Sequence, residues 1–225
     1  MRAKRRAALA QLDTLTQAIF LEMFGDPINN PKGWPLQTLG DVIDLITYGL
    51  TVRPEYHPVG IPLISAKEIR SGSIDYRSAS MISEVDFLRL SDKAKPKYGD
   101  VLFSKTGSIG HCASVEDETR IALAQNVARL VFRESIVNQR YAMCYLRCRS
   151  IQNLAQREAR GNAVKDLQLG VMERFPFPLP NLHLQQLFAC RGAAVEQLKL
   201  SHRASLAQLD ELFASLQHRA FRGEL

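Results

Sequence analysis

The stretch from Leu182 to Phe221 constrains the fold most, because its 40 residues contain no proline and a single glycine. Such a run predicts one continuous helix about 60 Å long, at ~1.5 Å per residue, which is more than a compact domain needs. Its residues can be written as heptads with two seam positions. The first position holds Phe188, Val195, His202, Leu209 and Leu216, and the second holds Arg191, Leu198, Ser205, Leu212 and Arg219.

We therefore expect a protruding helix that packs against a partner helix as a coiled coil. The apolar members of the two seam positions are the residues predicted to make this contact. They are Phe188, Val195, Leu198, Leu209, Leu212 and Leu216. The alternative is an amphipathic helix that lies along its own domain.

The beginning of the chain predicts a second helix, since apolar residues recur every three or four positions from Ala3 to Phe24 and Gly25 ends the pattern. Residues 6–24 also match residues 203–221 at nine of 19 positions, including LAQLD in both. Copies with the same apolar face can pack on the same surface. Two arrangements remain open: two chains pair through their long helices, or residues 6–24 fold back on their own chain's long helix and leave a monomer.

Between these helices the sequence is richer in β-forming residues. The runs VIDLIT, IPLISA, VLFSK and ARLVF are bounded by glycine, proline and aspartate, which predicts an irregular mixed sheet. A helix is expected over 138–160. The predicted fold class is therefore α+β, with an N-terminal helix at 1–25, an irregular β-rich domain at 26–181 and the long helix at 182–225.

Composition adds a weak indication of function and location. The chain has 29 basic and 23 acidic residues, a net charge of +6 that fits a nucleic-acid partner without requiring one. Four cysteines without CxxC spacing favour buried thiols in a reducing compartment over a zinc site. The basic N-terminus resembles the start of a signal peptide, but Gln11 and Asp13 interrupt the apolar run. We expect a cytoplasmic protein that does not span a membrane.

The glycine-rich segment SKTGSIG does not have the spacing of a nucleotide-binding loop. Gly107 and Gly110 are three residues apart and are not followed by lysine and a hydroxyl residue, as GxxxxGK[ST] requires. GxGxxG and HExxH do not occur either. The sequence therefore predicts no catalytic residue, no metal ligand and no cofactor in this chain. It leaves open whether His111 contacts a base or is simply a core or exposed histidine.

Three polar loops, TYGLTVRPEYH, SKTGSIG and REARGNAVKDLQ, supply side chains that can contact DNA. Arginine and asparagine can read base edges, whereas lysine and hydroxyl groups suit phosphates, and Tyr56 adds aromatic surface to the first loop. Plain turns with solvated charges are the alternative. The predicted DNA-binding residues are Thr47, Tyr48, Thr51, Arg53, Lys67, Ser104, Lys105, Thr106, Gly107, Ser108, Arg160, Asn162 and Lys165.

Five segments, in order, resemble type I restriction-modification specificity subunits. They are GIPLISAKEIRSGSID, YGDVLFSKTGSIG, ALAQNVARLVF, FPLPNLHLQQLFA and SLAQLDELFASLQHRAFRGEL. The resemblance implies a target-recognition domain that reads half of a split DNA site. It also implies a long conserved helix in an antiparallel coiled coil that dimerises the protein and docks partner subunits. This chain holds one such domain where the family usually has two.

The resemblance further implies a non-catalytic subunit of a half-sized form. Double-stranded DNA, a second copy of the chain and the type I modification (methyltransferase) and restriction subunits are the expected partners. S-adenosylmethionine and ATP with Mg²⁺ would be bound by those partner subunits. The rival hypotheses are a coiled-coil adaptor whose globular domain binds protein, and an enzyme with an atypical active site in the glycine turn.

Overall fold

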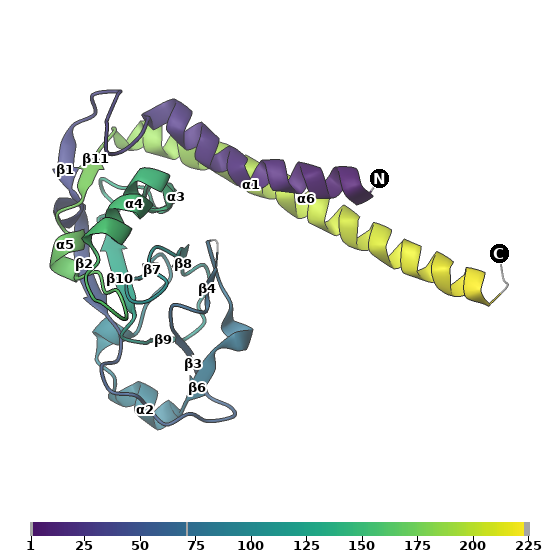
Figure 1. Cartoon of the computed structure of the whole chain (residues 1–225), viewed down its shortest axis with the longest axis horizontal. Coiled ribbons are helices and arrows are strands. Elements are labelled where there is room, and N and C mark those ends of the chain that lie inside the picture. The colour runs from purple at the N-terminus through teal and green to yellow at the C-terminus, as the bar shows by residue number, and fades with distance from the viewer. Residues whose placement is uncertain (1, 71, 223–225) are drawn as a thin grey trace.

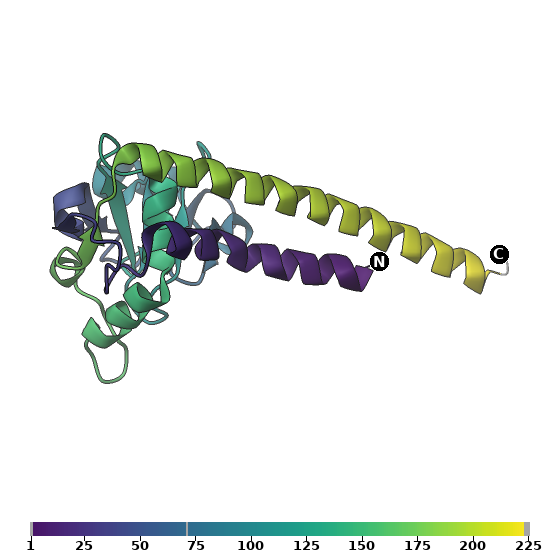
Figure 2. The ribbon, with the colours of Figure 1, turned by 90° about the horizontal axis from the view of Figure 1, so that it is seen from above.

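The computed structural model describes residues 2–70 and 72–222. Two helices extend side by side from a globular domain (Figure 1), and a view from above shows the same pair (Figure 2). They are α1 (Arg2–Phe24) and α6 (Leu182–Phe221), which run antiparallel, and α6 continues past the N-terminal end of α1. The predicted long helix is confirmed over its full 40 residues. No helix in the described part of the chain has the length and apolar character needed to cross a membrane.

The end of α1 follows the sequence pattern. Gly25 adopts a φ of +79°, a conformation that glycine reaches without steric cost, and its N–H donates to the carbonyl of Leu21 at 2.9 Å. The indole N–H of Trp34 donates to the carbonyl of Phe24 at 3.0 Å. The chain therefore leaves α1 in a fixed direction and enters the domain.

The domain contains two main sheets and two short strand pairs. The larger sheet is antiparallel, with the strand order β2 (Ile43–Tyr48), β10 (Val127–Phe132), β7 (Val101–Ser104) and β8 (Cys112–Ser114). The second has the order β6 (Ser80–Ile82), β3 (Ile61–Ile64) and β9 (Ala122–Leu123), with β3 and β9 parallel. The pairs are β1 (Leu36–Thr38) with β11 (Pro176–Pro178), and β4 (Ile69–Arg70) with β5 (Ser73–Ile74). The expected irregular mixed sheet and the α+β class are confirmed.

Short helices complete the domain. The α-helices are α2 (Glu84–Arg89), α3 (Gln139–Arg147), α4 (Arg149–Glu158) and α5 (Leu169–Met172), and the 3₁₀ helices cover Leu39–Val42, Tyr76–Ser78 and Asp92–Ala94. The single helix expected over 138–160 is wrong. Cys148 leaves the helical conformation at ψ 136°, and α4 takes a new direction from there.

An aromatic cluster joins the two long helices to the domain. The Phe20 and Phe24 rings of α1, the Tyr141 ring of α3 and the Phe188 ring of α6 lie 4.8 to 5.5 Å apart between centroids. All four side chains are buried. The hydroxyl of Tyr141 donates to the carbonyl of Pro178 at 2.6 Å, so the one polar atom of the cluster is satisfied. The α1–α6 helix pair, which forms a rod, therefore shares one core with the domain.

The face of α6 that meets α1 differs from the predicted seam at one of its two positions. Phe188 and Val195 are buried and Leu209 is half-buried, as the first seam position requires. At the second position Leu198 and Leu212 are instead 52% and 56% exposed, and Leu216 at the distal end of the first position is 41% exposed. The second row lies one residue further on, at the buried Gly192 and Lys199 and the half-buried Leu206.

Gly192 explains why this row was missed in the heptad pattern. A Cβ atom at position 192 would lie 2.9 Å from Cδ of Arg140 and 3.6 Å from Cγ2 of Thr16. The missing side chain lets α1 and α3 approach α6 closely. Leu198, Leu212 and Leu216 are thus exposed on the surface of α6.

Candidate nucleic-acid interface

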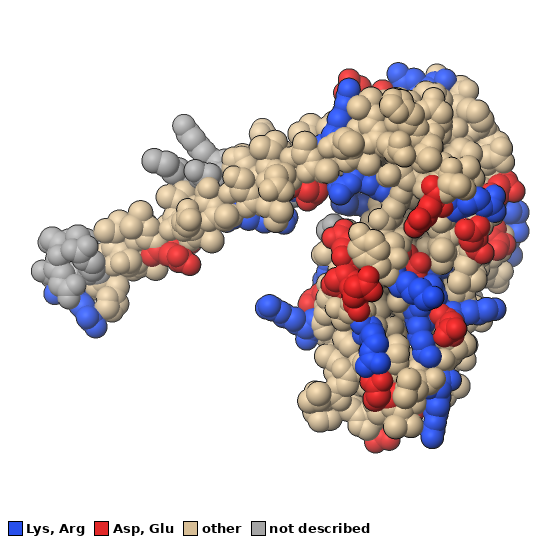
Figure 3. Space-filling model, turned by 180° about the vertical axis from the view of Figure 1, so that it is seen from behind, with Lys and Arg blue, Asp and Glu red and all other residues tan. Residues whose placement is uncertain are grey.

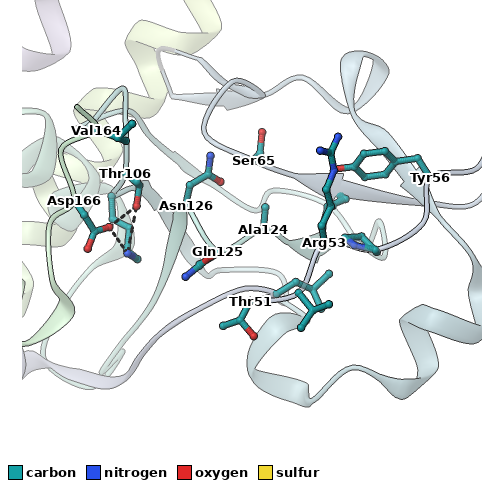
Figure 4. Close-up of a pocket in the computed structure, with 15 residues that line it drawn as sticks. Thr51, Arg53, Tyr56, Ser65, Thr106, Ala124, Gln125, Asn126, Val164 and Asp166 are labelled. Carbon is teal, nitrogen blue, oxygen red and sulfur yellow. Dashed lines mark hydrogen bonds and ion pairs between the residues drawn. The ribbon is translucent and has the colours of Figure 1, made fainter. Parts of the chain in front are cut away.

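Three polar segments that are distant in sequence meet around an open pocket of about 570 Å³ (Figure 4). They are the loop after β2, the SKTGSIG loop after β7 and the loop before α5. The turn between β9 and β10 lies between them. The lining residues are Leu50, Thr51, Val52, Arg53, Pro54, Tyr56, Leu63, Ser65, Lys105, Thr106, Ala124, Gln125, Asn126, Val164 and Asp166.

Backbone hydrogen bonds hold these segments together. The N–H of Gly107 donates to the carbonyl of Lys165 at 2.9 Å, and the N–H of Leu167 donates to the carbonyl of Lys105 at 2.8 Å. The N–H of Lys105 donates to the carbonyl of Asn126 at 2.9 Å. The pocket wall is therefore built from mutually fixed loops.

Helix α4 fixes the SKTGSIG loop from its other side. The side-chain amides of Gln152 and Gln156 donate to the carbonyls of Gly110 and Ile109 at 2.9 and 2.7 Å. Gly110 has a φ of +107°, and a Cβ there would lie 1.9 Å from Oε1 of Gln152. The break at Cys148 turns α4 so that it can make these contacts.

Lys105 is buried, unlike the free phosphate contact expected from the sequence. Its side chain is 8% exposed, and Nζ lies 2.6 Å from Oδ1 of Asp166, which also accepts a hydrogen bond from the hydroxyl of Thr106. Nζ lies 5.5 Å from the centre of the Tyr48 ring. Partial burial raises the pKa of Asp166, but the hydrogen bonds from Lys105 and Thr106 outweigh it, so the pKa lies below its ordinary value. The Lys105 charge is thus already paired within the protein.

Ser104 is also corrected by the structure. It is fully buried, its hydroxyl donates to the carbonyl of Ser108 at 2.6 Å, and its Oγ accepts from the N–H of His111 at 2.9 Å. Both hydrogen bonds lie within the loop. Ser104 shapes the turn and has no surface with which to contact DNA.

The other predicted residues divide between the pocket and its surroundings. Thr51, Arg53, Lys105 and Thr106 line the pocket. Tyr48 lies beside Lys105, and Gly107 and Ser108 are exposed at the loop tip. Arg160, Asn162 and Lys165 are exposed on the loop that packs on SKTGSIG, while Thr47 pairs with Arg129 in the sheet. Lys67 is outside the pocket lining, and its Nζ lies 3.3 Å from the buried carboxylate of Glu68.

Sequence reasoning missed Gln125 and Asn126, which lie between the Thr106–Asp166 side and the Arg53–Tyr56 side of the pocket (Figure 4). Two adjacent amide residues directly before the buried strand VARLVF were the available signal. Tyr56 stacks with Arg53, whose Cζ lies 5.3 Å from the ring centre. Within the described residues, the Arg53 guanidinium has no carboxylate partner.

Surface charge by itself does not single out this pocket. Figure 3 shows lysine and arginine side chains interspersed with acidic ones on the face of the domain opposite to that of Figure 1, and the rod in that view is mostly uncharged. Much basic charge is also paired, as in the buried contact of 2.6 Å between Arg129 and Asp100. The convergence of loops is a better guide than net charge.

The model of one protein family, "Type I restriction modification DNA specificity domain", matches residues 31–192. The chain belongs to this specificity family. The matched region contains every residue of the pocket lining and the first quarter of α6.

Relatives in the family agree with this assignment. The chain is 25% identical to the type I restriction enzyme EcoBI specificity subunit of Escherichia coli over 95% of this chain and 46% of that protein. It is 24% identical to the putative type I restriction enzyme MjaX specificity subunit of Methanocaldococcus jannaschii, over 85% of this chain and 48% of that one. The chain therefore spans about half the length of these curated relatives.

The solved structures agree on the fold. The crystal structure of the HsdS subunit from Thermoanaerobacter tengcongensis superposes with a TM-score of 0.64 at 20% identity, covering 100% of this chain and 54% of that chain. At this identity the likeness establishes the fold alone. Because the match covers the whole of this chain, it includes α6.

Proposed function

We propose that this chain is the DNA-specificity subunit of a type I restriction-modification complex and that it has no catalytic activity of its own. The observation that supports this most is the convergence of the three polar loops and the β9–β10 turn on one pocket inside the family's domain. Exposed arginine and amide side chains in the pocket, and exposed arginine and lysine side chains beside it, can contact both phosphates and base edges. Methyl transfer with S-adenosylmethionine and ATP-dependent cleavage would belong to the partner subunits.

We further propose that two copies read a split, symmetric site. A two-fold axis would set two long helices antiparallel and put a recognition domain at each end. Each helix is about 60 Å long, compared with ~34 Å for one turn of duplex, so half-sites separated by about one turn or slightly more are expected. The exposed Leu198, Leu212 and Leu216 offer apolar surface for the second copy or for the modification subunit.

Methylome sequencing tests both parts of this proposal. The chain and its cognate modification subunit are expressed together in a host without other adenine or cytosine methylation. A split, palindromic modified motif is expected. A motif that is modified but is not palindromic would contradict the homodimer, and the absence of any motif would contradict the specificity function.

A direct binding measurement separates this function from that of a protein-binding adaptor. Replacing Arg53, Arg160 and Lys165 by glutamine should weaken binding to the selected DNA at least tenfold, because these exposed groups lie at or beside the pocket. The matched control replaces Arg174, Arg191 and Arg203, which removes the same number of charges elsewhere. Equal weakening in both variants would indicate only general charge attraction and would favour the adaptor.

A further inference from the structure

The turn between β9 and β10 is held by buried flanking residues and by hydrogen bonds to its neighbours. Its flanking residues Leu123 and Val127 are both fully buried. The N–H of Ala124 donates to the carbonyl of Ile64 at 2.9 Å, and the carbonyl of Leu123 accepts from the N–H of Leu50 at 2.7 Å. With the bond from Lys105 to the Asn126 carbonyl, three neighbouring segments hold this turn.

Gln125 differs from its neighbours on this turn. The side-chain oxygen of Asn126 accepts from the N–H of Ala66 at 3.3 Å, so that amide is oriented by the protein. Gln125 is exposed, and its side-chain amide has no hydrogen bond to any residue that the structure describes. It therefore combines a fixed backbone with an unused donor and acceptor.

The side chain of Lys105, in contrast to that of Gln125, is already engaged within the protein. Its ammonium is buried and paired with Asp166, and the pair joins the SKTGSIG loop to the loop before α5. Because Asp166 already neutralises the Lys105 ammonium, we expect removal of both groups to leave the number of phosphates that the protein contacts unchanged. The pair is suited to holding the pocket wall in place beside the turn.

We propose that Gln125 is a specificity-determining residue that reads one base edge, and that the Lys105–Asp166 pair positions the pocket wall around it. This inference rests on the proposed DNA-specificity function. A glutamine amide can donate to N7 and accept from the N6 amino group's hydrogen of adenine in the major groove, so an adenine is the expected base. Arg53 and Tyr56 lie on the far side of the pocket and are available for the neighbouring backbone or base.

The experiment selects bound sequences from a randomised duplex library with the full chain, together with its modification subunit where the complex is needed for binding. Gln125→Ala should lose the preference at one base pair of each half-site, with a drop in discrimination of roughly tenfold or more, while the other positions stay unchanged. Gln125→Glu should move that preference from adenine towards cytosine, whose N4 amino group donates a hydrogen bond to the carboxylate. The matched control is Gln37→Ala, which removes an exposed glutamine of β1 that is not part of the pocket.

The outcomes separate the two levels of the proposal. A wild-type chain that enriches no motif would contradict the DNA-specificity function itself. A wild-type motif that Gln125→Ala retains in full would overturn the role of Gln125 alone. Equal weakening at all positions would make Gln125 a contact to the DNA backbone and would also overturn the inference.

The positioning pair has its own readout. Lys105→Met together with Asp166→Asn should reduce discrimination at several positions but leave the slope of log affinity against log salt unchanged, because the pair contributes no net charge. A slope reduced by about 1 would identify Lys105 as a phosphate contact and overturn its positioning role. Thermal unfolding of each variant, followed by circular dichroism, distinguishes a local change from loss of the fold.

Discussion

Two parts of the molecule are similar in sequence but lie in different environments. Residues 6–24 form most of α1, and residues 203–221 form the distal part of α6, with LAQLD in both. Phe24 of the first copy is buried among Trp34, Tyr141 and Phe188, whereas the equivalent Phe221 is 89% exposed. Both copies form a helix, but only the first copy packs against the domain.

The residues that differ between the copies explain which one docks. Phe20 is fully buried in the aromatic cluster, and the residue at the equivalent position in the second copy is the exposed Gln217. An amide placed among Tyr141, Phe188 and a phenylalanine would lose its hydrogen bonds to water without replacement, at a cost of roughly 1–3 kcal/mol. α1 lies on the long helix of its own chain, as one of the two sequence-based arrangements expected. Self-association of the chain stays a prediction.

The largest expected difference between the copies concerns stability. Phe24→Ala should lower the free energy of unfolding by about 3–5 kcal/mol because it leaves a cavity in the shared core. Phe221→Ala changes the same residue type at the equivalent position and should alter it by less than about 0.5 kcal/mol. Urea denaturation of the full chain measures both. Similar losses would mean that the distal copy is also packed in solution.

A second pair of variants tests which face of α6 meets α1. Val195→Ala removes two methyl groups from the buried row and should cost about 2 kcal/mol. Leu198→Ala removes more apolar surface but from an exposed position, and its cost should be within about 0.5 kcal/mol. Denaturation of the chain by itself is the appropriate measurement, since a partner could cover Leu198. A larger loss from Leu198→Ala would restore the heptad seam expected from the sequence.

Deleting residues 1–24 tests whether α1 competes with a second chain. The deletion uncovers the α6 face that carries Phe188 and Val195, where the distal copy of another chain can then pack. Self-association should rise at least tenfold, equivalent to about 1.4 kcal/mol. Sedimentation velocity measures this, and circular dichroism checks that the domain stays folded. Unchanged or weaker association would rule out the competition.

The smallest expected effect is that of Gln217→Phe in the full chain. This change gives the distal copy the aromatic residue that docks α1, but Phe20 already fills that position. Stability and self-association should therefore both stay within about 0.5 kcal/mol of the wild type. A clear rise in self-association would show that the distal copy of a second chain displaces α1 even when α1 is present.

Much of the fold follows from local patterns in the sequence. The absence of proline over 40 residues predicts α6, Gly25 ends α1, and four apolar runs became strands of the two main sheets. The polar loops named from the sequence supply most of the pocket wall. These features depend on residues within a few positions of one another, so the sequence by itself is sufficient to predict them.

Other features were decided by contacts between distant segments. The break at Cys148, the burial of Ser104, the pairing of Lys105 with Asp166 and the buried row at Gly192 each depend on residues far away in the chain. The role proposed for Gln125 also depends on what surrounds it, because two adjacent amide residues before a strand do not show which of them stays free of protein contacts. The sequence determined which segments form helices, strands and polar loops. The tertiary structure decided which polar groups face solvent, because burial and ion pairing depend on packing between elements and not on local periodicity.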